Sequence, residues 1–74
     1  MTRYYDVTTE GAGADGQTWT TRATIESEFH DVFETAMEDM FLQLTQGRAE
    51  FGNPGVGCNG PYTITRMVIE LSPV

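Results

Sequence analysis

The sequence contains no lysine, a single cysteine and a single histidine, and these shortages exclude several kinds of structure. One cysteine cannot form an internal disulfide bond, and Cys58 with His30 cannot supply the four ligands of a structural zinc site. A chain of 74 residues must then fold on its hydrophobic core. So short a chain buries only roughly 60% of the surface that its unfolded form exposes. Added stability from a second copy or another partner is therefore a reasonable expectation.

Long apolar runs are also missing. The longest apolar stretches are far shorter than the about 20 residues that span a bilayer, and the N-terminal residues do not follow the signal-peptide pattern. A single cysteine is typical of a reducing compartment. We therefore expect one cytoplasmic domain over residues 1–74, without membrane contact.

The charges are strongly unbalanced, with eleven acidic residues, four arginines and a net charge of −7. Such a surface repels phosphate backbones and anionic lipids, so direct binding to nucleic acid is not expected. It favours basic proteins as partners, and nucleic-acid-binding proteins are a large class of these. The alternative is that the charge serves only solubility.

Three segments have the composition of β-strands. Arg3–Thr9 and Thr18–Ile25 alternate apolar with polar side chains, and the glycine-rich loop between them contains Asp15-Gly16, which indicates a β-hairpin. Tyr62–Leu71 is the third and most hydrophobic strand. The residues expected to face the core from the first two strands are Tyr5, Val7, Thr9, Trp19, Thr21, Ala23 and Ile25.

The alternation in the third strand is imperfect. Strict alternation places Tyr62, Ile64 and Val68 on one face and Met67, Ile69 and Leu71 on the other. Either a bulge near Arg66 switches the faces, or both faces of this strand are partly covered.

A helix is predicted from about Glu28 to Gln46. Ser27 is its candidate N-cap, and Gly47 is its natural terminator, with Arg48 near the negative end of the helix dipole. Apolar residues follow the spacing of one helix face and are expected to pack on the sheet. This stripe consists of Phe29, Val32, Phe33, Ala36, Met37, Met40, Phe41 and Leu44.

The element order predicts an α+β fold, β-β-α-β. The expected structure is a three-stranded antiparallel sheet in the order 2-1-3, with the helix on one face. A glycine-rich loop, Arg48–Pro61, joins the helix to the third strand, and Phe51 is expected to tuck under it. The other sheet face then stays bare, and the second and third strands are open edges. Such surfaces suit self-association or strand addition by a partner.

No motif in the chain indicates catalysis. Residues 55–60 have the letters of a dinucleotide-binding loop, but a strand follows where that loop needs a helix. Cys58 has no neighbouring cation to activate its thiol. His30 and Glu34 share a helix flank, yet two ligands do not make a metal site, and a half-packed boundary histidine is the stronger interpretation. We expect no enzyme activity, no cofactor and no metal.

Acidic residues are concentrated in the helix and just before it, and no lysine or arginine lies between Glu26 and Asp39. Like charges four residues apart, such as Glu34 and Glu38, destabilise a helix slightly. A solvated helix face is one interpretation, and an anionic strip that binds arginines and lysines is the other. With the bare sheet face, the strip gives the candidate partner-binding residues Glu28, Asp31, Glu34, Glu38, Asp39, Tyr4, Asp6 and Arg22.

Taken as a whole, the acidic run from Glu26 to Asp39 and the hairpin-helix-strand plan from Arg3 to Leu71 resemble small acidic proteins of phages and mobile elements, anti-CRISPR proteins among them. The resemblance implies a protein that binds a CRISPR effector complex and blocks target recognition or cleavage. We therefore expect a stoichiometric inhibitor of a basic, nucleic-acid-handling protein. The alternative is a self-assembling accessory protein that dimerises through the bare sheet face or an edge strand.

Overall fold

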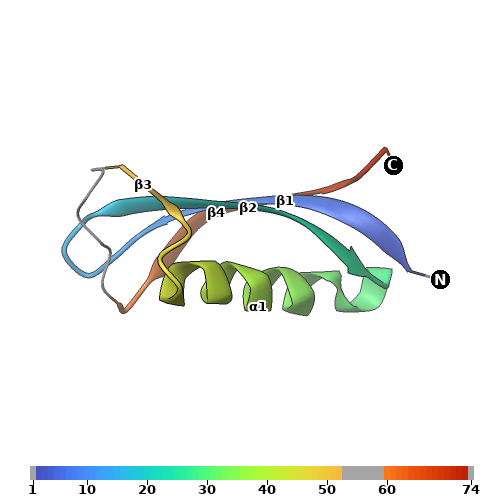
Figure 1. Cartoon of the computed structure of the whole chain (residues 1–74), viewed down its shortest axis with the longest axis horizontal. Helices are drawn as coiled ribbons and strands as arrows, with labels where there is room; N and C mark the ends of the chain where they lie inside the picture. The colour runs from blue at the N-terminus through green and yellow to red at the C-terminus, as the bar shows by residue number, and fades with distance from the viewer. Residues whose placement is uncertain (1, 53–59, 74) are drawn as a thin grey trace.

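A computed structural model of the chain describes residues 2–52 and 60–73. Figure 1 shows one helix packed against one face of a single sheet, so the expected α+β class is confirmed. In chain order the elements are β1 (Arg3–Ala12), β2 (Thr18–Ser27), the short 3-10 helix η1 (Phe29–Asp31), α1 (Val32–Thr45), β3 (Glu50–Phe51) and β4 (Thr63–Leu71).

The sheet is antiparallel throughout and has the strand order β3-β2-β1-β4. The order predicted for the three long strands is confirmed, but the predicted count of three strands is wrong. The additional strand lies inside the segment predicted as a loop, where Phe51 pairs with Trp19 and the Gly52 N–H donates to the Thr18 carbonyl at 3.0 Å. Phe51 packs against the core around Trp19, and this contact holds the two-residue strand on the edge of β2.

The hairpin is longer than predicted, because β1 and β2 stay paired as far as Ala12 and Thr18. The turn carries the expected Asp15-Gly16 pair. Gly16 has a φ of 83°, a conformation that glycine adopts without strain, and the Gln17 N–H donates to the Asp15 carboxylate at 3.1 Å.

Of the two alternatives for the third strand, the structure has the bulge near Arg66. Arg66 lies opposite Glu10, whereas Ile64 lies opposite Gly11, so Thr65 is an extra residue on β4. The extra residue switches the alternation, and it places Ile64 on the same side of the sheet as Met67. The β4 residues on the helix side are therefore Ile64, Met67, Ile69 and Leu71.

Two clusters of buried side chains form the core between α1 and the sheet. The first is built on Trp19, Met40, Leu44 and Ala49, and Tyr62 packs edge-on against Trp19 with ring centroids 6.4 Å apart. The second consists of Tyr5, Val7, Ile25 and Ala36. The inward faces predicted for the first two strands are confirmed, with Ala23 partly buried and the rest buried.

The start of the helix differs from the prediction. Residues 29–31 form η1, and α1 begins only at Val32. Ser27 is the buried last residue of β2 and not an N-cap, because Glu28 precedes η1 and Asp31 precedes α1. The Ser27 hydroxyl instead donates to the Glu28 carbonyl at 3.0 Å. The predicted end is confirmed: Gly47 has a φ of 69°, and the Arg48 N–H donates back to the Gln43 carbonyl at 2.8 Å.

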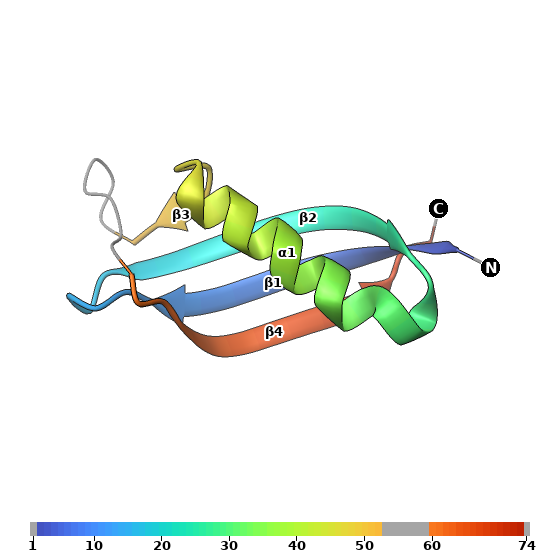
Figure 2. The same ribbon diagram turned by 90° about the horizontal axis from the view of Figure 1, so that it is seen from below.

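The predicted apolar stripe is wider than the buried face of the helix. Ala36, Met40 and Leu44 are buried, but Phe29, Phe33 and Phe41 are 81%, 60% and 54% exposed. The reason is the position of α1, which runs obliquely across the sheet and packs mainly on β2 and β1 (Figure 2). A single helix on a narrow sheet buries only the line of side chains directly above the strands.

Candidate protein-binding surfaces

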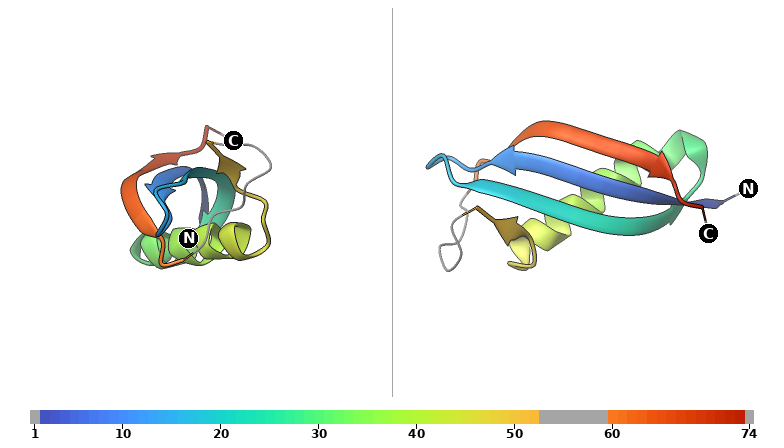
Figure 3. Two further views of the ribbon diagram at one scale, coloured as in Figure 1. Left: turned by 90° about the vertical axis from the view of Figure 1, so that its left-hand side faces the viewer. Right: turned by 90° about the horizontal axis from the view of Figure 1, so that it is seen from above.

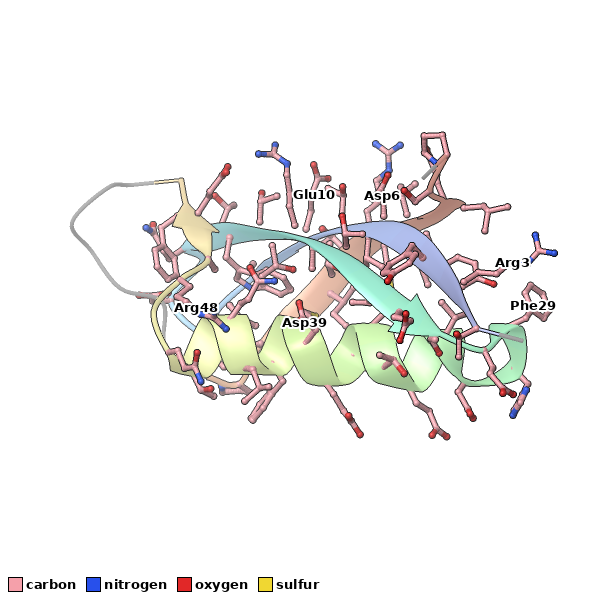
Figure 4. The ribbon with its side chains drawn as sticks, turned by 45° about the vertical axis from the view of Figure 1, so that its right-hand side comes forward. Arg3, Asp6, Glu10, Phe29, Asp39 and Arg48 are labelled. Carbon is pink, nitrogen blue, oxygen red and sulfur yellow. The ribbon has the colours of Figure 1, made fainter. Side chains whose placement is uncertain are left out.

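The predicted partner-binding residues lie on two opposite surfaces of a molecule that measures 40 × 20 × 19 Å. The sheet face turned away from α1 carries no helix, and no described segment covers its centre (Figure 3). Asp6 and Glu10 project from this face, away from α1 (Figure 4). Tyr4 and Arg22 share the sheet face with Asp6 by strand alternation, whereas the acids of α1 lie on the far side. One flat partner therefore cannot contact all the predicted residues together.

The bare sheet face is polar and carries charges of both signs. The Arg22 guanidinium forms an ion pair with the Glu50 carboxylate at 2.8 Å, and the Thr24 hydroxyl donates to the Asp6 carboxylate at 2.8 Å. A shallow hollow lies between β1 and β2 beside these side chains. The charged and aromatic residues that the registers place on this face are Tyr4, Asp6, Glu10, Arg22, Glu26, Glu50, Arg66 and Glu70.

Tyr4 is the one group on this face with a resolved change in acidity. A hydrogen bond to the Glu26 carboxylate, and the negative charge of that carboxylate, raise the pKa of Tyr4 above its ordinary value. Glu26 lies directly opposite Tyr4 in the β1–β2 register. The phenol is thereby kept protonated, as a hydrogen-bond donor, at the end of the sheet face.

The outward side of the helix is acidic. Glu34 and Glu38 are exposed there, Asp31 is exposed in η1 just before the helix, and Phe41 and Leu42 are exposed at the margins. We call these five residues the acidic helix face. α1 contains no basic residue, so no charge within the helix compensates these acids.

Asp39 does not belong to the acidic helix face. The side-chain amide of Gln43 donates to the Asp39 carboxylate at 2.7 Å and to the Arg22 carbonyl at 3.2 Å. These bonds place Asp39 at the seam between α1 and the edge of β2, as Figure 4 also shows. Its role is to hold Gln43, and through it the helix, against β2.

His30 is 71% exposed in its side chain, so the prediction of a half-packed boundary histidine is wrong. It lies in η1, where α-helical spacing to Glu34 does not apply. Its Nδ1 is 3.5 Å from the Glu28 carboxylate and its Nε2 is 3.2 Å from the Asp31 carboxylate. Within residues 2–52 and 60–73, no three His, Cys, Asp or Glu side chains converge as a metal site would require.

Two of the sequence features fall wholly or mainly outside the described residues. Cys58 and most of the 55–60 glycine pattern lie in the undescribed segment 53–59. No helix in the described ranges is both long enough and apolar enough to cross a membrane.

A surface that the sequence prediction missed lies on the flank of α1 that faces β4. Asp39 and Gln43 mark the flank toward β2, so at about 100° per residue Phe41 lies on the opposite flank. Phe33 has the same angular position as the buried Met40 and Leu44, but it lies in the first turn of α1 and its side chain is exposed. The helix side of β4 adds two more exposed apolar side chains, Ile64 and Leu71. We call these four residues the apolar flank. One indication of this surface was present in the sequence, because the helix contains more apolar residues than a single line of contact with the sheet can bury.

Comparisons with known protein families, with curated proteins and with solved structures find no match to this chain. The functional argument therefore rests on the surfaces described above.

Proposed function

We propose that the protein is a stoichiometric inhibitor or regulator that binds a basic, nucleic-acid-handling protein through its acidic helix face. The observation that carries this proposal is the outward side of η1 and α1, which exposes Asp31, Glu34 and Glu38 beside two apolar residues and contains no lysine or arginine. Acids supply attraction to arginines and lysines, and exposed apolar side chains supply buried contact area once a partner docks.

The bare sheet face supports this role less well. Two of its acids already have partners within the chain, since Glu50 pairs with Arg22 and Asp6 accepts from Thr24. Its second arginine, Arg66, adds another positive charge to the same surface. The two surfaces carry a similar net charge, but only on the sheet do arginines lie among the acids, where they repel a basic partner, so the helix suits such a partner better. A CRISPR effector complex is one partner of this chemistry, as the resemblance to anti-CRISPR proteins suggests.

The test is affinity capture from the lysate of the native host with three forms of the tagged protein, at low and at high salt. The first is wild type, the second is Glu34→Lys with Glu38→Lys, and the third is Glu10→Lys with Glu26→Lys. Both double variants change the net charge equally, but on opposite surfaces. We expect wild type and the sheet variant to recover the same basic nucleic-acid-binding protein at low salt, and the helix variant to lose it.

High salt should reduce the recovery by wild type, because screening weakens attraction between exposed charges. Equal recovery by the helix variant and wild type would show that the acidic helix face is only a solvated surface. Circular dichroism of both double variants is the control for folding.

A further inference from the structure

The outer edge of β4 has backbone hydrogen-bonding groups available along its length. The Ser72 N–H donates to the Tyr4 carbonyl at 2.9 Å, which makes Ser72 and Tyr4 a hydrogen-bonded pair of the β1–β4 ladder. Such pairs alternate along an antiparallel ladder. The even-numbered residues of β4 therefore bond to β1, and the N–H and C=O groups of Met67, Ile69 and Leu71 point outward.

The opposite edge of the sheet is closed in comparison. β3 pairs with the first part of β2, and the Gln43 side chain donates to the Arg22 carbonyl on the same edge. No described residue is paired with the outer side of β4, and Figure 2 shows it as the free border of the sheet. An edge of this kind is a template for a further strand.

The sequence of β4 is complementary to itself when read in the opposite direction. In the run Arg66-Met67-Val68-Ile69-Glu70, an arginine and a glutamate stand at equal distances from Val68. Antiparallel pairing of two β4 strands centred on Val68 places Arg66 of each copy opposite Glu70 of the other. The same register pairs Met67 with Ile69 on the helix side, and these are the residues whose backbone groups point outward. Charge, side-chain alternation and hydrogen bonding therefore all agree on one register.

The β1–β4 pairing within one chain leaves a charge problem that this register solves. Asp6 lies directly opposite Glu70, and like charges at such positions destabilise a sheet. No ion pair compensates Glu70 within the described part of the chain. In this register, Arg66 of a second copy would lie beside Glu70, on the side of β4 that faces away from β1.

The apolar flank adjoins the same edge. Phe33 and Phe41 are exposed on α1, with Phe41 on the flank opposite β2, and Ile64 and Leu71 are exposed on the helix side of β4. A second copy related by a twofold axis through Val68 would bring its own apolar flank to the same place. Both flanks would then lose contact with water, which favours association.

From these four observations we propose that the protein forms a twofold-symmetric homodimer by antiparallel pairing of β4 with β4, centred on Val68. The two four-stranded sheets become one continuous sheet with both helices on the same side. Phe41 belongs to both surfaces, but the acids of the helix face, Asp31, Glu34 and Glu38, stay outside the interface. The dimer therefore does not depend on the proposed function, and each can fail without the other.

The test is sedimentation equilibrium of the purified full-length protein and three charge variants. Wild type is expected to be a dimer with a micromolar dissociation constant. Arg66→Glu and Glu70→Arg each create two repulsive contacts across the twofold axis, so each should raise that constant about tenfold or more. The double variant, Arg66→Glu with Glu70→Arg, restores both pairs and should dimerise again. Within one chain the two changed positions face separate residues, Glu10 and Asp6, so recovery relative to the single variants can come only from contacts between chains.

Cross-linking tests the register directly. In a Cys58→Ser background, Val68→Cys should form an intermolecular disulfide with oxidised glutathione, because the two positions face each other across the axis. Thr8→Cys is the matched control, since Thr8 lies beside Val68 on the same face but one strand inside the edge. A wild-type protein that stays monomeric at high concentration would overturn the proposal. Equal cross-linking of both cysteine variants, or a double charge variant that stays monomeric, would overturn the register.

Discussion

Among the described glycines, Gly11 is the one at which an added β-carbon would overlap the most atoms. It lies on the helix side of β1, where the bulge of β4 begins, between the Trp19 ring and the Thr63 carbonyl. A β-carbon at this position would overlap both groups. The absence of a side chain at Gly11 is thus what allows Trp19 to be buried.

Replacing Gly11 by alanine is expected to lower the free energy of unfolding by about 1–3 kcal/mol, as overpacking of a core does. Gly60→Ala is the control, since a β-carbon there would make only ordinary contacts with the Tyr62 ring. Urea denaturation followed by Trp19 fluorescence measures both. Equal stability of Gly11→Ala and wild type would mean that the strands move to accommodate the β-carbon with no loss in the free energy of unfolding.

Tyr4 and Glu26 give a prediction about pH. Because the folded state raises the pKa of Tyr4, its contribution to stability is complete below its unfolded pKa, about 10, and is lost as the pH rises through the folded value. Glu26→Gln removes the carboxylate charge, so the pKa of Tyr4 should fall toward its ordinary value. An NMR titration of the Tyr4 ring measures this shift, and an unchanged pKa would contradict the assigned cause.

At the scale of elements, the helix shows which structural features a sequence pattern predicts and which it does not. Its position, its glycine terminator and its packing against the sheet were predictable from periodicity and from Gly47. The buried width was not, because it depends on how the helix crosses the strands. Phe33 has the same angular position on the helix as the buried Met40 and Leu44, yet it lies in the first turn of α1 and its side chain is 60% exposed.

The helix prediction can be checked by truncating one buried and one exposed residue. Leu44→Ala should lower the free energy of unfolding by about 2–4 kcal/mol, because it removes buried methyl groups and leaves a cavity. Phe29→Ala should change it by less than about 0.5 kcal/mol, as expected for an exposed site. Thermal or urea denaturation by circular dichroism provides both values. A large effect at Phe29 would show that its ring packs on the domain.

Among the strands, too, some features were predictable from the sequence and others were not. The long strands were predictable from their alternation, but the broken alternation near Arg66 left a bulge and a strand covered on both faces as alternatives, and only the structure decides for the bulge. A strand of two residues, such as β3, has no periodicity to detect. Phe51 gave a partial indication, because an isolated aromatic residue in a glycine-rich segment needs a core to contact.

For the whole molecule, composition sets the amount of charge but not its distribution in space. Tyr4 and Glu34 both qualified as candidate binding residues, and the fold separates them onto opposite surfaces. Asp39 was indistinguishable from Glu38 in sequence, but its hydrogen bond to Gln43 places it at the helix–β2 seam. In the proposed dimer both acidic helix faces lie on one side of the continuous sheet. Such a dimer could engage two basic sites at once, with the gain in avidity that two linked sites provide.

The most direct test of the central claim, that the acidic helix face is the binding surface, is the dissociation constant of the partner captured by wild type. It should be measured for wild type, Glu34→Lys with Glu38→Lys, and Glu10→Lys with Glu26→Lys, at two salt concentrations. The account predicts binding at least about tenfold weaker for the helix variant, near wild-type binding for the sheet variant, and weaker wild-type binding at high salt. Loss of binding by the sheet variant, with wild-type affinity in the helix variant, would contradict it.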